Sequence, residues 1–93
     1  MFNVVSTLFE RSRTRVHITI DGNHYMVLNT RAGSWNPRWF TDIVTCDSKG
    51  NITGYPVVDP GWLRHMTPDT YKDDIAELVT DYHWSEPNYF NNP

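Results

Sequence analysis

Residues 67 to 84 constrain the fold most, because this stretch has both a start signal and the periodicity of an amphipathic helix. The Thr67 hydroxyl can accept hydrogen bonds from the first free amides, and Pro68 suits the first helical position, where no N–H is needed. Apolar residues recur at helical spacing and form one stripe: Tyr71, Ile75, Leu78, Val79 and Tyr82. The pattern predicts a helix from Thr67 to Trp84 that buries this stripe.

The polar side of the predicted helix is strongly acidic. Asp73, Glu77 and Asp81 follow one another at i, i+4 spacing, where like charges repel and destabilise a helix slightly. Asp74 adds to the negative charge, and only Lys72 dilutes it. A solvated helix face is the ordinary explanation for such residues. The alternative is a negative surface that binds a basic partner.

Residues 15 to 29 predict a β-hairpin, because β-branched and polar residues alternate on both sides of Asp21, Gly22 and Asn23. We prefer a two-residue loop. With that loop, one face contains Val16, Ile18, Ile20, Tyr25 and Val27. A three-residue loop would exchange the faces and turn Met26 and Leu28 inward.

A second hairpin is predicted from about Trp39 to Val58. Its turn, residues 47 to 51, has the order of a type I turn closed by a left-handed glycine. That turn sets Cys46 opposite Ile52 and Val44 opposite Gly54. The resulting apolar face contains Phe40, Val44, Cys46, Ile52 and Val58. Pro56 cannot donate a ladder hydrogen bond, so its strand should be at a sheet edge or bulged there.

These segments together predict an α+β fold. We expect a mainly antiparallel sheet of four to five strands, with one C-terminal amphipathic helix packed on one face. Residues 2 to 13 fit either a helix or a strand, and their β-branched residues favour the strand. Trp62, Leu63 and Met66 should pack at the helix entry. The helix stripe should pack on Val16, Ile18, Ile20, Val27 and Val44.

Length and composition indicate a single small globular domain. The chain has 93 residues, 39% of them hydrophobic and 20% charged, which suits one domain over residues 1–86 and a tail over residues 87–93. Its apolar runs are too short to span a bilayer, and its start does not have the pattern of a signal peptide. We therefore expect a soluble cytoplasmic protein, either a monomer or a small homo-oligomer.

Positive and negative charges are divided unevenly along the chain. Residues 1–45 carry five arginines and three acids, whereas residues 46–93 carry three basic residues and eight acids. This asymmetry could steer charged partners or simply keep the protein soluble. The net charge of −3 argues against a strong nucleic-acid binder.

The sequence contains no recognisable catalytic or metal-binding motif. The four histidines, His17, His24, His65 and His83, have no ligand spacing, and we expect His17 and His24 on the solvent side of their hairpin. Cys46 is the single cysteine, and we expect it to act as a small buried hydrophobe. We therefore predict no enzymatic activity, no metal and no cofactor.

The segment from Arg31 to Phe40 mixes arginines with aromatic residues, including Trp35 and Arg38. Such a mixture suits single-stranded nucleic acid, because bases stack on aromatic rings and phosphates pair with guanidinium groups. It suits a protein interface equally well. The arginines available for nucleic acid are Arg11, Arg13, Arg15 and Arg31, with Trp35 as the stacking residue.

These observations lead to three functional hypotheses. The first is a non-enzymatic protein-binding module, with a partner-binding set of Asp73, Asp74, Glu77, Asp81, Trp35 and Arg38. Small size and the absence of motifs are typical of phage or mobile-element proteins that inhibit a host enzyme or a nucleic-acid-binding complex. The second is a single-stranded nucleic-acid binder. The third is a small enzyme whose histidines the fold would bring together beside a carboxylate.

Overall fold

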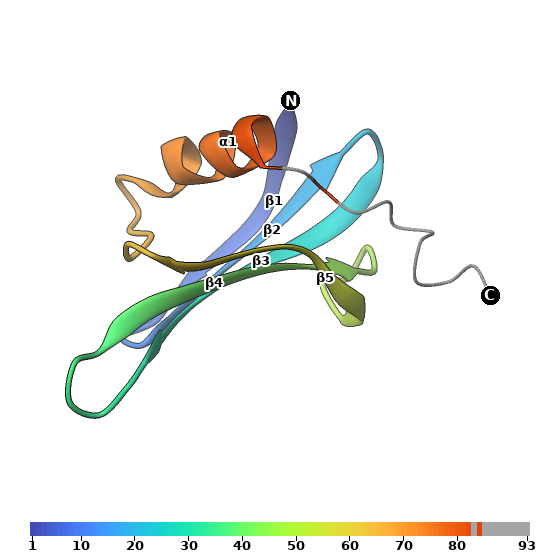
Figure 1. Ribbon diagram of the computed structural model, residues 1–93. Coiled ribbons are helices and arrows are strands. Elements are labelled where there is room, and N and C mark those ends of the chain that lie inside the picture. Colours follow the sequence, from blue (N-terminus) through green and yellow to red (C-terminus); the bar gives the residue numbers. More distant parts are fainter. Residues whose placement is uncertain (83, 85–93) are drawn as a thin grey trace.

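The computed structural model describes residues 1–82 and 84, and it shows a five-stranded antiparallel sheet with one helix on one face (Figure 1). The elements are β1 (Phe2–Phe9), β2 (Arg13–Ile20), β3 (Asn23–Ala32), β4 (Arg38–Cys46), β5 (Ile52–Leu63) and α1 (Tyr71–Asp81). Each strand pairs with the next one along the chain. The predicted α+β class is confirmed, and so is the strand at the N-terminus. The tail predicted for residues 87–93 lies outside the described residues.

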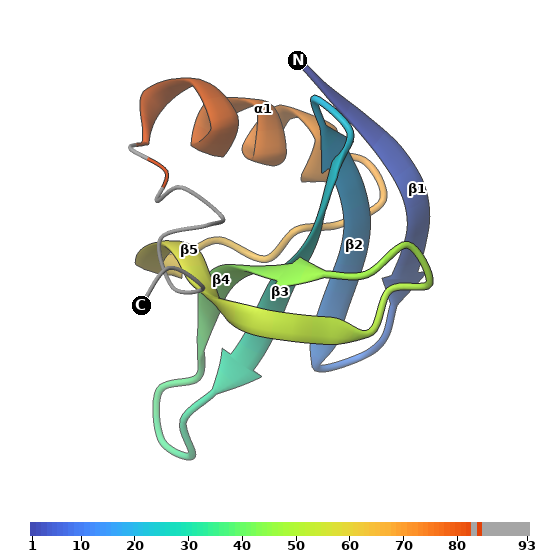
Figure 2. The same ribbon diagram turned by 90° about the vertical axis from the view of Figure 1, so that its right-hand side faces the viewer.

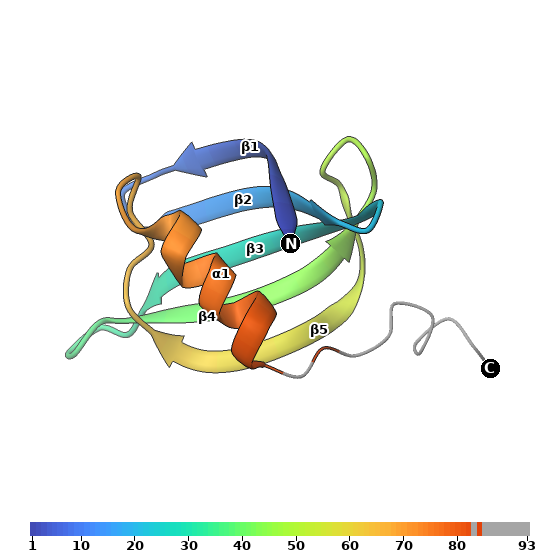
Figure 3. The same ribbon diagram turned by 90° about the horizontal axis from the view of Figure 1, so that it is seen from above.

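Helix α1 crosses the sheet diagonally and covers the middle strands, as Figure 3 shows. The core between them contains Val16, Ile18, Tyr25, Val27, Ile43, Val57, Val58, Met66, Ile75 and Leu78. Fully burying one such side chain stabilises the fold by roughly 1.5–3 kcal/mol. No helix in the described part of the chain has the length and apolar character needed to cross a membrane.

The β2–β3 hairpin has the predicted two-residue loop. Ile20 pairs with Asn23 across the turn, and Asp21 and Gly22 both have positive φ angles, of 52° and 82°. Asp and Gly are among the residues that tolerate this backbone conformation best. The register therefore places Tyr25 and Val27 in the helix-side core, as predicted.

The β4–β5 hairpin begins as predicted and then departs from the expected register. Cys46 pairs with Ile52, but Val44 pairs with Pro56 rather than Gly54, and Ile43 pairs with Val58. Two extra residues lie on β5 between the Cys46 and Val44 pairs and one more between the Val44 and Ile43 pairs, so Val58 changes face. The prediction for Pro56 is confirmed, because β5 is both an edge strand and bulged.

The predicted apolar face of this hairpin is therefore wrong in part. Val58 lies in the helix-side core, whereas Val44 and Cys46 join Met26 in a second cluster on the other side of the sheet. Val44 consequently lies outside the core that α1 covers. Ile52 is half exposed.

The helix is shorter than predicted at both ends. Residues 67–70 form a hydrogen-bonded turn, in which the carbonyl of Thr67 accepts from the amides of Thr70 and Tyr71. The amide of Thr67 donates to the hydroxyl of Thr70, so Thr67 does not cap the helix. The helix ends at Asp81, and the indole of Trp84 donates back to the carbonyl of Leu78.

The segment between β5 and α1 is only partly as predicted. Met66 is fully buried in the core, as expected for a residue at the helix entry. Trp62 is half exposed and its ring contacts Phe40 instead. Neighbouring residues of a strand point to opposite faces of the sheet. Because Thr41 faces the helix side, Phe40 and its partner Trp62 lie on the opposite face.

Strand β1 forms the other edge of the sheet and contains an irregularity. Val4 pairs with Ile18 and Ser6 pairs with His17, so Val5 has no opposite residue. Val5 is 51% exposed. Beyond it, the sheet curves so that the β4–β5 turn approaches β1, as Figure 2 shows.

Candidate partner-binding surfaces

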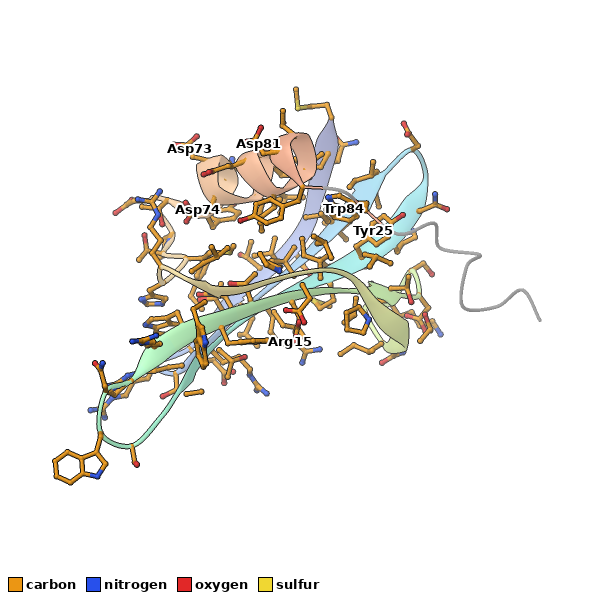
Figure 4. All side chains as sticks on the ribbon, in the orientation of Figure 1. Arg15, Tyr25, Asp73, Asp74, Asp81 and Trp84 are labelled. Carbon is orange, nitrogen blue, oxygen red and sulfur yellow. The ribbon has the colours of Figure 1, made fainter. Side chains whose placement is uncertain are left out.

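Three carboxylates of α1 form an exposed row, which we call the acidic row: Asp73, Glu77 and Asp81. Figure 4 shows Asp73 and Asp81 on the side of the helix away from the sheet. Within residues 1–82 and 84, none of the three forms an ion pair. The early arginines therefore do not neutralise the row within the described structure.

Asp74 does not belong to the exposed acidic surface, although the sequence pattern predicted it there. One residue further along a helix turns the side chain by about 100°, which brings Asp74 round to the sheet side beside Ile75. Asp74 is only 8% exposed, and its Oδ1 accepts hydrogen bonds from Arg64 Nε at 2.8 Å and Nη2 at 2.6 Å. This interaction raises the pKa of Arg64.

The other oxygen of Asp74 is unusual. Oδ2 is buried and has no hydrogen-bond partner among the described residues. A buried carboxylate oxygen without a donor is costly, because it has lost its water and gained nothing in exchange. A donor supplied from outside the chain would remove this cost.

Buried polar residues of the sheet fix the backbone that carries Arg64. The amide nitrogen of Asn29 donates to Thr41 Oγ1 and to the carbonyl of Arg64, and its oxygen accepts from the amide of Met66. The Thr14 hydroxyl donates to the carbonyl of Met66. These bonds hold residues 64–66 against the sheet and so place Arg64 next to Asp74.

A pocket of about 290 Å³ lies between the end of β5 and α1. Its walls are Leu63, Arg64, Met66, Asp74, Glu77, Leu78 and Tyr82. The lining combines apolar side chains with two carboxylates and the Arg64 guanidinium. Glu77 belongs to both the pocket and the acidic row, so the two features form one continuous surface.

Trp35 and Arg38 lie away from that surface. Residues 33–37 form the loop between β3 and β4, which projects from one end of the sheet (Figure 1). Trp35 is 96% exposed. The structure therefore separates the predicted partner-binding set into the acidic row with its pocket and a distant aromatic loop.

The arginines proposed for nucleic acid are also divided. Arg11, Arg13 and Arg31 line an open groove beside the β1–β2 turn, where Arg13 forms an ion pair with Glu10 at 2.9 Å. The amide of Arg31 donates to the carbonyl of Ser12 and closes this end of the sheet. Arg15 instead lies on the face away from α1, as Figure 4 shows.

Two of the four histidines meet. His17 Nε2 lies 2.8 Å from His24 Nδ1, and burial together with the neighbouring His24 lowers the pKa of His17. The predicted solvent position of His17 is wrong, because it is 3% exposed and the 47–51 turn packs over it through Gly50. His83 lies outside the described residues.

A histidine-based enzyme would need two histidines brought together beside a carboxylate. The structure brings together the two histidines, His17 and His24. The carboxylate of Asp47 accepts from the backbone of Lys49 and Asn51 and from the Asn51 side chain, which lowers its pKa. Among the described residues, no three potential ligands form a metal-binding group. Cys46 is buried, and burial raises the pKa of its thiol.

The pair of Arg64 and Asp74 and the pocket beside it were not predicted from the sequence. The available signal was a lone arginine among the eight acids of residues 46–93. Comparisons with known proteins add nothing to this geometry: no protein-family model, curated protein or solved structure matches the chain.

Proposed function

We propose that this protein is a non-enzymatic binding module that captures a basic segment of another protein along α1. The observation that carries the proposal is the continuity between the acidic row and the pocket, which share Glu77. Basic side chains of the partner would pair with the row, and one of them would enter the pocket. There, the unpartnered Oδ2 of Asp74 would accept a hydrogen bond from it.

The energetics of α1 support this reading. Acids at i, i+4 repel one another, and Asp81 lies at the helix C-terminus, where the backbone carbonyls already carry partial negative charge. The last turn contains no basic residue to offset this. A cationic partner would therefore relieve repulsion that the isolated chain retains.

The chemistry of the partner also suggests how the module would act. Basic segments line the nucleic-acid-binding grooves of many proteins. Occupying such a groove would exclude its nucleic acid, so the module would inhibit the protein it binds. This mode of action matches the inhibitor hypothesis and requires no catalytic residue.

A peptide-binding experiment tests the proposal. The probe is a fluorescent arginine-rich peptide, and the variant replaces the row by Asp73→Asn, Glu77→Gln and Asp81→Asn. We expect affinity to fall about tenfold, since each exposed charged pair contributes roughly 0.2–1 kcal/mol. Fluorescence anisotropy measures the dissociation constant.

The matched control changes the net charge equally, but away from α1. It carries Glu10→Gln, Asp21→Asn and Asp59→Asn, which are all exposed acids outside α1. We expect near-native affinity from this control. Equal weakening by both variants would show that only net charge matters, and the proposed surface would then be wrong.

The second candidate function is binding of single-stranded nucleic acid at the arginine-rich end of the sheet. A specific observation favours it: Trp35 is almost fully exposed, in the loop between the strands that carry Arg31 and Arg38. An exposed indole can stack on a base. Retention on a single-stranded DNA column at low salt, reduced by Trp35→Ala, tests it, and the absence of retention would exclude it.

A further inference from the structure

A second pocket, of about 190 Å³, lies on the sheet face opposite to α1. It forms where the β4–β5 turn folds back over β1, β2 and β3, an approach that Figure 2 shows. Its walls are Ser6, Leu8, Arg15, His17, Met26, Lys49 and Gly50. Two of these residues, Arg15 and Lys49, carry full positive charges.

Arg15 contributes a buried donor to this pocket. Its Nε is buried and has no hydrogen-bond acceptor within the described residues. In the sheet, Arg15 lies between Leu8 of β1 and Leu28 of β3, so its stem is flanked by apolar side chains. A buried guanidinium N–H without an acceptor is destabilising, and it therefore marks a place for an external acceptor.

Among the other polar residues of the lining, Lys49 and Ser6 can donate, and His17 already pairs through Nε2 with His24. Lys49 supplies an ammonium group from the turn, and Ser6 supplies a hydroxyl from β1. Asp47, the acid within the turn, uses its carboxylate to accept from Lys49 N, Asn51 N and Asn51 Nδ2. The carboxylate of Asp47 therefore stabilises the turn that carries Lys49.

We propose that this pocket binds the phosphate group of a small molecule. Arg15 Nε and the Lys49 ammonium would each donate to phosphate oxygens, and the Ser6 hydroxyl would complete the set. Two cations suit a doubly charged oxyanion better than a carboxylate, and guanidinium groups match phosphate geometry. Leu8 and Met26 form an apolar wall for the carbon atoms attached to the phosphate.

The site is independent of the proposed partner surface. It lies on the other face of the sheet and shares no lining residue with the pocket beside α1. The oxyanion could be free phosphate or a small phosphate ester. Both supply the same oxygens, and the ester adds contact with Leu8 and Met26.

The test is a titration of ¹⁵N-labelled protein followed by NMR at constant ionic strength. The ligands are inorganic phosphate, glycerol phosphate and acetate, and the signal is the Nε–H cross-peak of Arg15. We expect a saturable shift with both phosphates and a weaker one with acetate. Tighter binding of glycerol phosphate than of inorganic phosphate would assign the ester as the ligand, and equal binding would assign free phosphate.

Substitutions separate a built site from general attraction of anions. Arg15→Gln and Lys49→Gln should each weaken phosphate binding by about tenfold, because each removes a charge-assisted hydrogen bond. Lys49→Arg should restore binding. Arg38→Gln removes the same charge in β4, outside the pocket, and should leave phosphate affinity unchanged.

Three results would overturn the proposal. They are an Arg15 cross-peak that does not move, equal weakening by Arg38→Gln, and acetate affinity as high as that of phosphate. Because Lys49 is exposed in a turn, its substitution leaves the fold intact, and the test does not depend on the stability of the Arg15 variant.

Discussion

Asn29 shows how one buried polar residue can organise a site in another part of the chain. It contributes to β3, yet its side chain binds Thr41 in β4 and the backbone of Arg64 and Met66. These contacts hold the connection between β5 and α1 in the position that pairs Arg64 with Asp74. The sequence does not reveal this role, because an asparagine in a strand has no local signature for distant backbone partners.

Replacing this residue by Asn29→Ala should lower the free energy of unfolding by about 3 kcal/mol, because buried donors and acceptors lose their partners. Urea denaturation measures the change. Asn3→Ala, at an exposed position of β1, is the matched control and should change stability little. Equal stability of the two variants would contradict the structural role of Asn29.

His17 should make the stability of the fold depend on pH. Burial and His24 lower its pKa in the folded state below the unfolded value of about 6.5. As the pH falls through that value, His17 takes up a proton in the unfolded chain but stays neutral in the folded chain. Stability should therefore decrease between about pH 7 and pH 5.

The measurement is the free energy of unfolding in urea across that pH range. His17→Gln should reduce the slope of stability against pH, because the variant has no imidazole at the buried position. A slope of unchanged steepness would show that His17 is not responsible.

At the level of elements, the sequence predicted the features that depend on residues close together in the chain, such as a turn or the periodicity of a helix. The Asp21–Gly22 turn fixes the register of β2 and β3, and the periodic stripe of α1 identifies Ile75 and Leu78 as core residues. Pro56 indicated an edge or a bulge in β5 but not how many residues the bulges add, so Val44 and Val58 were assigned to one face although they lie on opposite faces. His17 was misplaced for a related reason, because long-range packing of a turn buries it.

Leu78→Asp tests the packing of α1. It places a charge at a position that is 1% exposed, and it should destabilise the fold by more than about 4 kcal/mol. Thr80→Asp introduces the same residue on the exposed side of the helix and should leave the fold intact. Thermal unfolding followed by circular dichroism compares them, and equal melting temperatures would refute the position of the helix.

For the molecule as a whole, the fold converts an uneven sequence into separated surfaces. The acids of residues 46–93 supply the acidic row, and the arginines of residues 1–45 supply the groove beside the β1–β2 turn. The charge imbalance was predictable from composition. Its division into separate surfaces was not, because that depends on how the strands and the helix pack together.

Binding of a basic peptide to the acidic row should therefore depend strongly on salt. Raising ionic strength from about 0.05 M to 0.5 M shortens the screening length to a few ångströms, which weakens attraction between exposed charges. Anisotropy titrations at several salt concentrations should show a steady loss of affinity. An affinity independent of salt would show that apolar contacts, rather than the row, hold the peptide.

The irregular residue in β1 has a consequence for how this protein behaves in a crowded solution. An edge strand presents unpaired backbone N–H and C=O groups, so a strand of a second molecule can pair with it and begin a fibre. The irregularity at Val5 shifts the register within β1, so a regular strand cannot pair with β1 along its whole length. We therefore expect the irregularity at Val5 to hinder edge-to-edge association of β1 with a second copy of the protein.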